Sequence, residues 1–289
     1  MNAKKIAAIF LCGVLAFSAG CGFWNTGDSM ENRELRVGML KNFNVSEKEY
    51  AAIIKQESAE KGGIPSTQFL SITSYNTLSA LLMGLDAGTI DVASTYQSVA
   101  NYLMARSPHY TQTDFIKAGM MDAFCCALRK ENAELLQSMN QAIADMEEEG
   151  TLDRLVKEYI TDIKNGQDPP PVATPKFPGA ETIRVAVTGD LPPIDMILPD
   201  GSPAGFNTAV LSEIGRRIEK NIEIIRVDSG ARITALTSGQ VDAVFWAVVP
   251  AEPLTARPPE ISPSLDISTT RPYYKDEIVH LKLKYTHKR

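Results

Sequence analysis

The chain of 289 residues carries 35 acidic and 29 basic side chains, a net charge of −6, with no long run of either sign. This mildly acidic balance argues against a nucleic-acid partner, and the length suffices for two modest domains or one large one. The three histidines, His109, His280 and His287, are scattered, so we expect no metal site. Adjacent Cys125 and Cys126 would point to opposite faces of a strand, which argues against a disulfide framework. The sequence has no phosphate loop, dinucleotide fingerprint or nucleophile elbow, so we predict neither a cofactor nor an enzyme.

The N-terminus has the pattern of an export signal. Two lysines precede an apolar run over residues 6–17, which is too short to span a bilayer. Ser-Ala-Gly then precedes Cys21, and small residues before a cysteine resemble a bacterial lipobox. We therefore predict a signal peptide over residues 1–20, lipidation of Cys21 and a tether over 21–34, which would anchor the protein to the outside of the cell membrane. The alternative is an ordinary secretory signal with a chance cysteine.

The first half of the chain alternates strand and helix patterns. Ser46 and Glu49 form a capping box for a helix that we expect to end near residue 61. A second helix has an apolar face of leucines and is expected to end at Gly88. Strands are predicted at residues 35–40, 68–72 and 90–94. This βαβαβ order implies a parallel sheet.

A break in the pattern divides the chain. Residues 164–179 contain five prolines, so they can form neither a helix nor a central strand, and we predict an exposed connector. The alternation then resumes, with strands at residues 183–187 and 222–227 around a helix that Asn207 is expected to cap.

The two halves share one motif. Leu-x-x-Gly-x-Ile-Asp-Val occupies residues 85–92 and Leu-x-x-Gly-x-Val-Asp-Ala occupies 236–243. Each closes a helix with glycine and enters a strand through an aspartate, so two similar α/β lobes are the simplest explanation. We interpret Asp91 and Asp242 as partners of the neighbouring backbone; a ligand role is the weaker alternative.

Several motifs after the connector follow one order. They are Ile-Arg-Val-Ala-Val at 183–187, Asp-Leu-Pro-Pro at 190–193, Asp-Gly-x-x-x-Gly-Phe-Asn at 200–207, the shared motif at 236–243 and Arg-Pro-Tyr-Tyr at 271–274. As a set they resemble the N-terminal lobe of the type II solute-binding proteins of amino-acid ABC importers. Upstream, Ala-Leu-Arg-Lys at 127–130 and Gly-Thr-Leu at 150–152 are similar to the C-terminal helical segment of the same family.

The resemblance implies an α/β fold of the bilobed type II periplasmic-binding-protein class, with two parallel or mixed sheets joined by a hinge and the lobe order permuted. The implied divisions are a second-lobe-like domain at 35–130, C-terminal-type helices at 131–165 that pack on the first lobe, a proline-rich linker at 166–180, and a first-lobe-like domain with a final hinge strand at 181–289. Exposed termini that lie close together make a circular permutation tolerable. The alternative is two truncated copies that exchange halves in a dimer.

The resemblance also implies how a solute would be held. In the family, an arginine clamps the ligand carboxylate, and an acid of the other lobe receives the ammonium group. Here the stretch after Asp242 lacks the Thr-Pro-Glu-Arg signature expected there. The candidate replacements are Arg232, Arg257 and Arg271. Tyr96 stands where the acid is expected, and these departures argue against a standard α-amino acid as the solute.

Further candidate ligand-binding residues follow strand ends, where open α/β sheets place their ligands. They are Asp190 and Asp195 around the turn after residue 187, Ser94 and Thr95 before Tyr96, and Trp246 and Ala247 in the altered stretch. Trp246 and Tyr96 suit a ring-bearing or less charged solute. The alternatives are turn roles for the polar residues, with the aspartates solvated, and core or hinge packing for the aromatic ones.

We therefore predict an extracytoplasmic receptor that closes two lobes around a small amino-acid-like or related polar solute and presents it to an ABC permease. The expected partners are the solute, the permease and the membrane, the last through the lipid anchor. The alternative is a non-transport sensor or scaffold lipoprotein with a degenerate cleft. A lyase or dehydratase on the same fold is a third interpretation.

Overall fold

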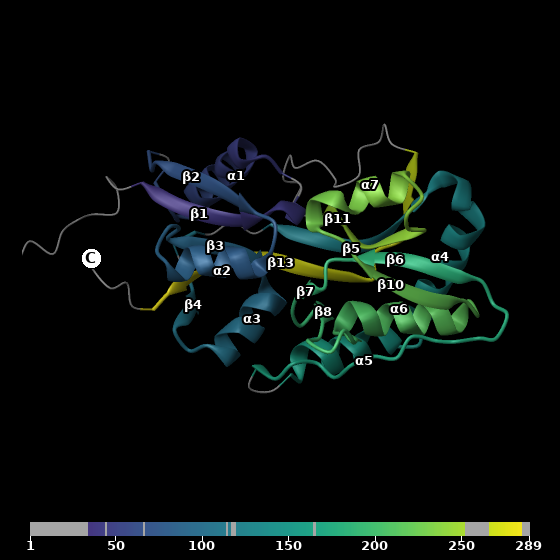
Figure 1. Cartoon of the computed structure of the whole chain (residues 1–289). Helices are drawn as coiled ribbons and strands as arrows, with labels where there is room; N and C mark the ends of the chain where they lie inside the picture. The colour runs from purple at the N-terminus through teal and green to yellow at the C-terminus, as the bar shows by residue number, and fades with distance from the viewer. Residues whose placement is uncertain are drawn as a thin grey trace, which may run out of the picture.

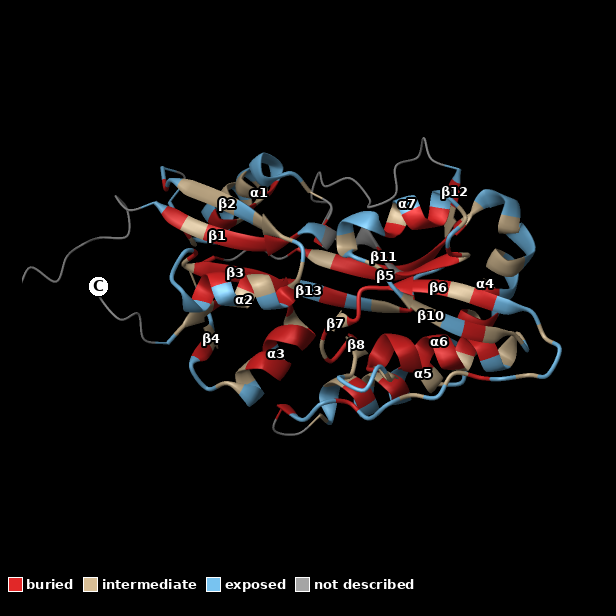
Figure 2. Cartoon of the chain, in the orientation of Figure 1, coloured by how far each residue is buried: buried red, intermediate tan, exposed pale blue. Residues whose placement is uncertain are grey.

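The chain folds into two α/β lobes that lie side by side (Figure 1). The computed structural model describes residues 34–43, 45–65, 67–113, 115–116, 120–163, 166–251 and 266–284. A ten-stranded sheet runs through both lobes in the order β10-β6-β11-β5-β13-β3-β1-β2, with β12 beside β5 and β4 beside β13. Buried residues follow these strands and the helix faces that cover them (Figure 2), so the sheet is the common core.

Lobe A contains the elements that precede β5 and the end of β13. Its strands are β1 (Leu35–Leu40), β2 (Leu70–Tyr75), β3 (Val92–Tyr96) and β4 (Tyr110–Gln112), and its helices are α1 (Glu47–Glu60), α2 (Leu78–Asp86) and α3 (Gln97–Arg106). β1 pairs in parallel with both β2 and β3. The predicted parallel βαβαβ unit is confirmed.

Lobe B contains most of the remaining chain. Its strands are β6 (Thr182–Val187), β7 (Asp190–Leu191), β8 (Asp195–Ile197), β9 (Pro203–Ala204), β10 (Asn221–Arg226), β11 (Ala243–Ala251) and β12 (Ile267–Thr269), and its helices are α4 (Ala133–Glu148), α5 (Thr151–Val156), α6 (Phe206–Arg217) and α7 (Arg232–Thr237). β6 pairs in parallel with β10 and β11. Lobe B therefore repeats the parallel three-strand arrangement of lobe A.

Two long strands pass from one lobe to the other. They are β5 (Met121–Arg129) and β13 (Tyr274–Leu283). The first half of β13 pairs with β5, and its second half pairs with β3 of lobe A. β5 continues into lobe B, where it pairs with β11. Because both strands belong to both lobes, a rotation of one lobe against the other bends the chain here.

Local signals placed the start of α1 and the end of α2 correctly. Ser46 and Glu49 form the predicted capping box at α1, since the Ser46 backbone N–H donates to Glu49 Oε2 (3.0 Å) and the Glu49 N–H donates to Ser46 Oγ (3.2 Å). Gly88 follows the end of α2 with φ +68°, a left-handed conformation that suits glycine. Both predictions are confirmed.

The predicted cap at Asn207 is wrong. The helix begins one residue earlier, at Phe206, and Gly205 is its N-cap residue. Phe206 N–H donates to the carbonyl oxygen of Pro193 (3.0 Å) and Asn207 N–H donates to that of Ile194 (2.7 Å). Because the backbone already satisfies these first helical donors, no side-chain cap is needed.

The motif shared by the two halves corresponds to one repeated contact. In lobe A, the backbone N–H of Arg36 donates to Asp91 Oδ2 (3.0 Å), and Arg36 Nη2 donates to Asp91 Oδ1 (2.7 Å). In lobe B, the same two donors of Arg184 reach Asp242 at 2.9 and 2.8 Å. The aspartates thus hold the first strand of each lobe, and their interpretation as partners of the neighbouring backbone is confirmed.

The adjacent cysteines lie in β5 and are both buried. Burial raises the pKa of the Cys125 thiol to about 12, so its reactive thiolate form is scarce at neutral pH. Both are free thiols, and the predicted strand setting is confirmed.

Candidate functional site

Aromatic side chains fill the junction of the two lobes. Phe43 after β1 contacts Tyr96 (5.3 Å between ring centroids), and Tyr96 contacts Phe124 of β5 (5.0 Å). Phe124 contacts Tyr274 of β13 (5.5 Å), which contacts Phe206 in lobe B (4.9 Å). This row of rings joins the two lobes through the hinge strands and buries apolar area where they meet.

Tyr96 makes a polar contact within this row. Its hydroxyl donates a 2.9 Å hydrogen bond to Asp122 Oδ2, and both residues are fully buried. The resemblance placed an acid at position 96, and the structure supplies a carboxylate to the same place from the hinge strand. The sequence did not lead us to Asp122 as a candidate, although a single aspartate at the start of the apolar run of β5 indicates a buried polar role.

Asp276 lies directly opposite Asp122 in the pairing of β13 with β5. It accepts hydrogen bonds from the backbone N–H of Ser98 (3.3 Å) and from the Ser98 hydroxyl. The N-cap residue of α3, Tyr96, makes no side-chain cap, so Asp276 performs this role from the hinge strand. Burial raises the pKa of Asp276 to about 6, although the hydrogen bonds from Ser98 favour the charged form and lower the pKa.

The candidates Ser94 and Thr95 lie in β3, next to the second half of β13. Ser94 Oγ is 2.9 Å from Nδ1 of buried His280. Burial lowers the pKa of His280 to about 3, so the ring is neutral at physiological pH. Thr95 Oγ1 is buried and has no hydrogen-bond partner within the described ranges. The structure thus places both hydroxyls inside lobe A, beside the hinge.

Asp195 is fully buried, so it is not the solvated turn residue of the alternative interpretation. Its Oδ2 atom accepts from the backbone N–H groups of Thr188 (3.0 Å) and Gly189 (2.9 Å) and from the Thr188 hydroxyl (2.9 Å). The carboxylate therefore fixes the turn that follows β6.

Asp190 reaches from lobe B to lobe A. Its Oδ2 atom accepts a 3.3 Å hydrogen bond from the backbone N–H of Leu78, the first residue of α2. Burial raises the pKa of Asp190, although the Thr188 and Leu78 donors favour the ionised form. A carboxylate at a helix N-terminus is electrostatically favourable, so this contact holds the two lobes together.

Arg232 begins α7 and is fully buried. Burial is the main cause that raises the pKa of Tyr273; the charge of Asp195 raises it further, and Arg232 opposes the shift. Asp195 and Arg232 therefore lie within electrostatic reach of the same hydroxyl. That hydroxyl donates to Asn207 Oδ1 at 3.0 Å.

The remaining candidates are placed only in part. Trp246 and Ala247 belong to β11, whose pairing with β5 is irregular between Phe245 and Ala247. Ala247 is buried, whereas the side chain of Trp246 lies outside the described residues. Arg257 and Cys21 also lie outside them. Arg271 pairs with Glu147 of α4 at 2.5 Å, which gives it a contact within lobe B.

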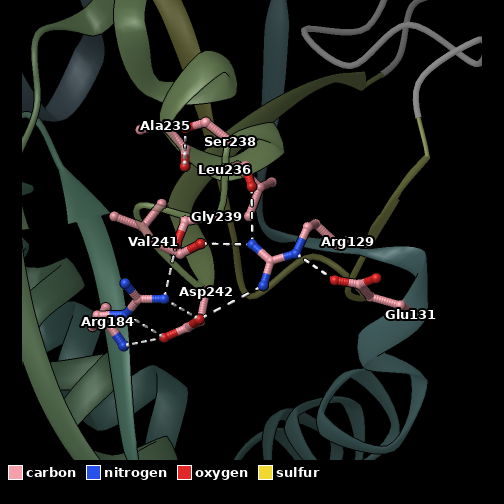
Figure 3. A network of polar contacts seen from close by, with 9 residues as sticks. All are labelled: Arg129, Glu131, Arg184, Ala235, Leu236, Ser238, Gly239, Val241 and Asp242. Carbon is pink, nitrogen blue, oxygen red and sulfur yellow. Dashed lines mark hydrogen bonds and ion pairs between the residues drawn. The ribbon is translucent and has the colours of Figure 1, made fainter.

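A separate pocket of about 600 Å³ opens at the N-terminal end of β6, beside the start of α4. Arg129 donates Nη1 to the carbonyl oxygens of Leu236 (2.9 Å) and Val241 (2.7 Å), and it also lies 3.6 Å from Asp242 (Figure 3). Since its guanidinium is already engaged by protein groups, Arg129 joins β5 to the loop that precedes β11. Among the candidate solute residues, Asp190 and Asp195 instead follow the C-terminal end of β6, while Ser94 and Thr95 lie within β3.

In the part of the chain that the structure describes, no three His, Cys, Asp or Glu side chains gather to hold a metal ion. In that same part, no helix is long and apolar enough to cross a membrane.

No curated protein matches the chain. It is similar to the ligand-binding component of an ABC-type import system from Staphylococcus aureus, with 11% identity over 87% of this chain and 66% of that chain, and a TM-score of 0.42. It is also similar to the GluR0 ligand-binding core in complex with L-glutamate (14% identity, 88% and 86% coverage, TM-score 0.43). A probable amino-acid ABC transporter extracellular-binding protein from Bacillus subtilis gives 12% identity, 88% and 86% coverage, and a TM-score of 0.42.

The chain thus spans just under two thirds of the length of the Staphylococcus aureus protein. Residues 52–162 and 183–252 match the sequence profile of one protein family, and these segments cover more than half of the chain. The profile and the two lobes agree on a type II solute-binding fold. This chain belongs to the bacterial extracellular solute-binding proteins, family 3.

Proposed function

We propose that this protein is the extracytoplasmic solute-binding component of an ABC import system. The observation that carries the proposal is the pair of strands β5 and β13, which join the lobes side by side. Around this hinge, the segment that follows β6 in lobe B contacts the start of α2 in lobe A through Asp190 and Leu78. Closure of the lobes on a solute requires only a higher affinity of the solute for the closed state.

The order of the elements supports a circular permutation as part of this proposal. Residues 35–130 correspond to the family's second lobe, 131–165 to its last helices, and 181–289 to its first lobe with the final hinge strand. The linker at 166–180 then joins the usual last helix to the usual first strand. β5 and β13 complete the sheet of both lobes within one chain, which favours permutation over two copies that exchange halves.

The charges at the junction and strand ends favour a solute with an amine. Among the described residues, the buried or half-buried carboxylates there are Asp122, Asp190, Asp195 and Asp276, and the basic groups are Arg232, which is buried, and Arg226, whose charge acts on Asp190. The N-terminus of α2 already receives a carboxylate of the protein. A small polar solute that carries an amino group, and does not depend on a free carboxylate at α2, fits this balance best.

Anchoring is part of the proposal too. Cys21, after the apolar run of residues 6–17, is the proposed lipid attachment site. A lipid anchor would keep the receptor at the membrane that contains its permease.

A second candidate function is a non-transport sensor or scaffold lipoprotein. The buried hydrogen bond between Tyr96 and Asp122 favours it, because two polar groups at the expected ammonium site are already bonded to each other. The two candidates differ in whether any solute stabilises the closed lobes.

The experiment is thermal unfolding of the protein without residues 1–21 against amino acids, amines, small peptides and nucleobases. A ligand at a hundred times its dissociation constant adds about 2.7 kcal/mol to the free energy of unfolding. A shift confined to one chemical class supports a receptor and identifies the class. A cooperative transition that no solute shifts supports the sensor or scaffold.

A further inference from the structure

The connector between the two halves of the chain touches both lobes. Its described part, residues 166–180, follows the helical segment that ends at Thr161 and leads to β6. Beyond Pro171 it lies on lobe B, whereas its first residues lie against α3 of lobe A. These two sets of contacts are of different kinds.

The contacts with lobe B are made mainly by backbone groups. Val172 N–H donates to the carbonyl oxygen of Pro203 at 2.9 Å. Phe177 N–H donates to Asn221 Oδ1 at 2.6 Å, and Asn221 Nδ2 donates back to the carbonyl oxygen of Phe177 at 3.1 Å. The carbonyl oxygen of Ala173 accepts from Ser212 at 2.8 Å. The connector therefore moves with lobe B.

The contact with lobe A centres on Asp168. Arg106 Nη1, in the last turn of α3, donates to Asp168 Oδ1 at 2.6 Å, and the hydroxyl of Tyr102 donates to the same oxygen. Arg106 Nη1 also donates to the carbonyl oxygen of Gly166 at 3.2 Å. Tyr102 is buried, so the carboxylate of the connector is bonded to a residue inside lobe A.

Gly166 brings the connector into backbone contact with α3. Its φ is +64°, and a Cβ added there would lie 2.6 Å from Arg106 Cβ and 2.7 Å from Arg106 N. A side-chain Cβ does not approach non-bonded atoms this closely, so only glycine permits this approach. The backbone of the connector is therefore packed directly on the end of the helix.

We propose that this contact is a further link between the lobes, besides β5, β13 and the Asp190–Leu78 hydrogen bond, and that it holds the lobes in their present arrangement without a solute. The first turn of α3 is attached to the hinge strand through Ser98 and Asp276, whereas Arg106 lies at the other end of the helix. A ten-residue helix is about 15 Å long, so a lobe rotation of about 20° moves this end by about 5 Å. That displacement exceeds what hydrogen bonds tolerate, so the link must break when the lobes rotate.

The test measures the distance between the lobes in the chain without any solute, so it is independent of the proposed transport function. Spin labels are placed at the exposed positions Ala59→Cys in α1 and Glu148→Cys in α4, in a Cys12→Ser, Cys21→Ser background. The remaining cysteines, Cys125 and Cys126, are buried. Distance distributions are recorded by pulsed electron spin resonance.

Asp168→Asn removes the charge of the link, and Gly166→Ala removes its backbone contact. We expect both to add a second distance population, with a change in the population ratio of roughly two- to fivefold for Asp168→Asn, the range that a half-exposed ion pair supports. The matched control is Glu158→Gln, which breaks the 3.2 Å pair with Arg154 inside lobe B at similar exposure. This control should leave the distribution unchanged.

Salt gives a second measurement. Raising the ionic strength to about 1 M screens the exposed ion pair. It should therefore change the distance distribution of the unsubstituted chain in the same way as Asp168→Asn does, and it should have little effect on the distribution of that variant. Should Gly166→Ala fail to fold, Asp168→Asn and the salt series decide. Identical distributions for the unsubstituted chain and Asp168→Asn at both salt concentrations would overturn the proposal.

Discussion

The hydroxyl of Tyr96, at the end of β3 in lobe A, donates a 2.9 Å hydrogen bond to Asp122 of the hinge strand β5, which lies beyond β13 in the sheet. Both groups are fully buried, so each depends on the other for part of its hydrogen bonding. The contact ties the end of a lobe A strand to the element that bends when the lobes rotate. It also occupies the place where the family resemblance implied an acid for the solute.

Removing one partner of this pair should be costly. Tyr96→Phe removes the donor to a buried carboxylate and should lower the free energy of unfolding by about 1–3 kcal/mol. Asp122→Asn should lower it less, because an amide oxygen can still accept. In urea unfolding, a double-mutant cycle with Tyr96→Phe and Asp122→Ala, each of which removes the hydrogen bond, should give a coupling of at least about 1 kcal/mol, and additive effects would contradict the account.

Asp276 gives the stability a specific pH dependence. Its pKa of about 6 lies above the ordinary value of 3.8, so the folded state binds this proton more tightly than the unfolded chain does. Its contribution is therefore fully favourable below about pH 4 and is lost as the pH rises through 6. Asp276→Asn mimics the protonated form, so its stability relative to the unsubstituted protein should improve by about 2–3 kcal/mol between pH 4 and pH 7.

Denaturant titrations of both proteins at several pH values check this. His280 makes a contribution to stability with the opposite pH dependence. Burial lowers its pKa to about 3, so acidification destabilises the folded protein by favouring the charged ring of the unfolded chain. The comparison with Asp276→Asn cancels this contribution, since both proteins contain His280. A difference that stays constant from pH 4 to pH 7 would show that Asp276 is not the group responsible.

Asp242 should behave in the usual way for a paired carboxylate. Burial alone would raise its pKa, but hydrogen bonds from Arg184 outweigh burial and hold the pKa below the ordinary value. Its contribution is thus present above about pH 4 and is lost as the pH falls further. Asp242→Asn should cost about 1–3 kcal/mol at pH 7 and less at pH 3, which urea unfolding at the two pH values measures. An equal cost at both would contradict the charge-based interpretation.

Asp190 provides a test of the direct contact between the lobes. Asp190→Ala removes the acceptor for the Leu78 N–H, whereas Asp190→Asn keeps an oxygen in the same position. We expect small-angle X-ray scattering to give a larger radius of gyration for Asp190→Ala in the absence of a solute, with Asp190→Asn in between. The same radius for all three proteins would mean that this hydrogen bond does not hold the lobes.

The sequence predicted the local elements well because their signals are local. β1 was expected at residues 35–40 and lies there, and the capping box of Ser46 places the start of α1. The end of β3 was less accurate, since the predicted strand at 90–94 lies at Val92–Tyr96. Asn207 failed as a cap because carbonyl groups of a distant turn satisfy the helix donors, and side-chain propensity cannot reveal that.

The contacts at the junction were beyond sequence reasoning. Asp122 and Asp276 face each other only because β5 and β13 pair in one register, and a shift of one residue would turn their side chains to the other face. Likewise, nothing local in residues 166–168 indicates that they lie on α3. Resemblance to a family provided the hinge strands, whereas the polar contacts around them required the structure.

The central claim is that the lobes close on a small solute with an amino group. Isothermal titration calorimetry with matched pairs of solutes tests it most directly, for example cadaverine against glutarate and putrescine against succinate. We predict saturable binding of at least one amine-bearing member, with no detectable binding of its acidic counterpart. Tighter binding of the acidic members, or no heat of binding from any pair, would contradict this account.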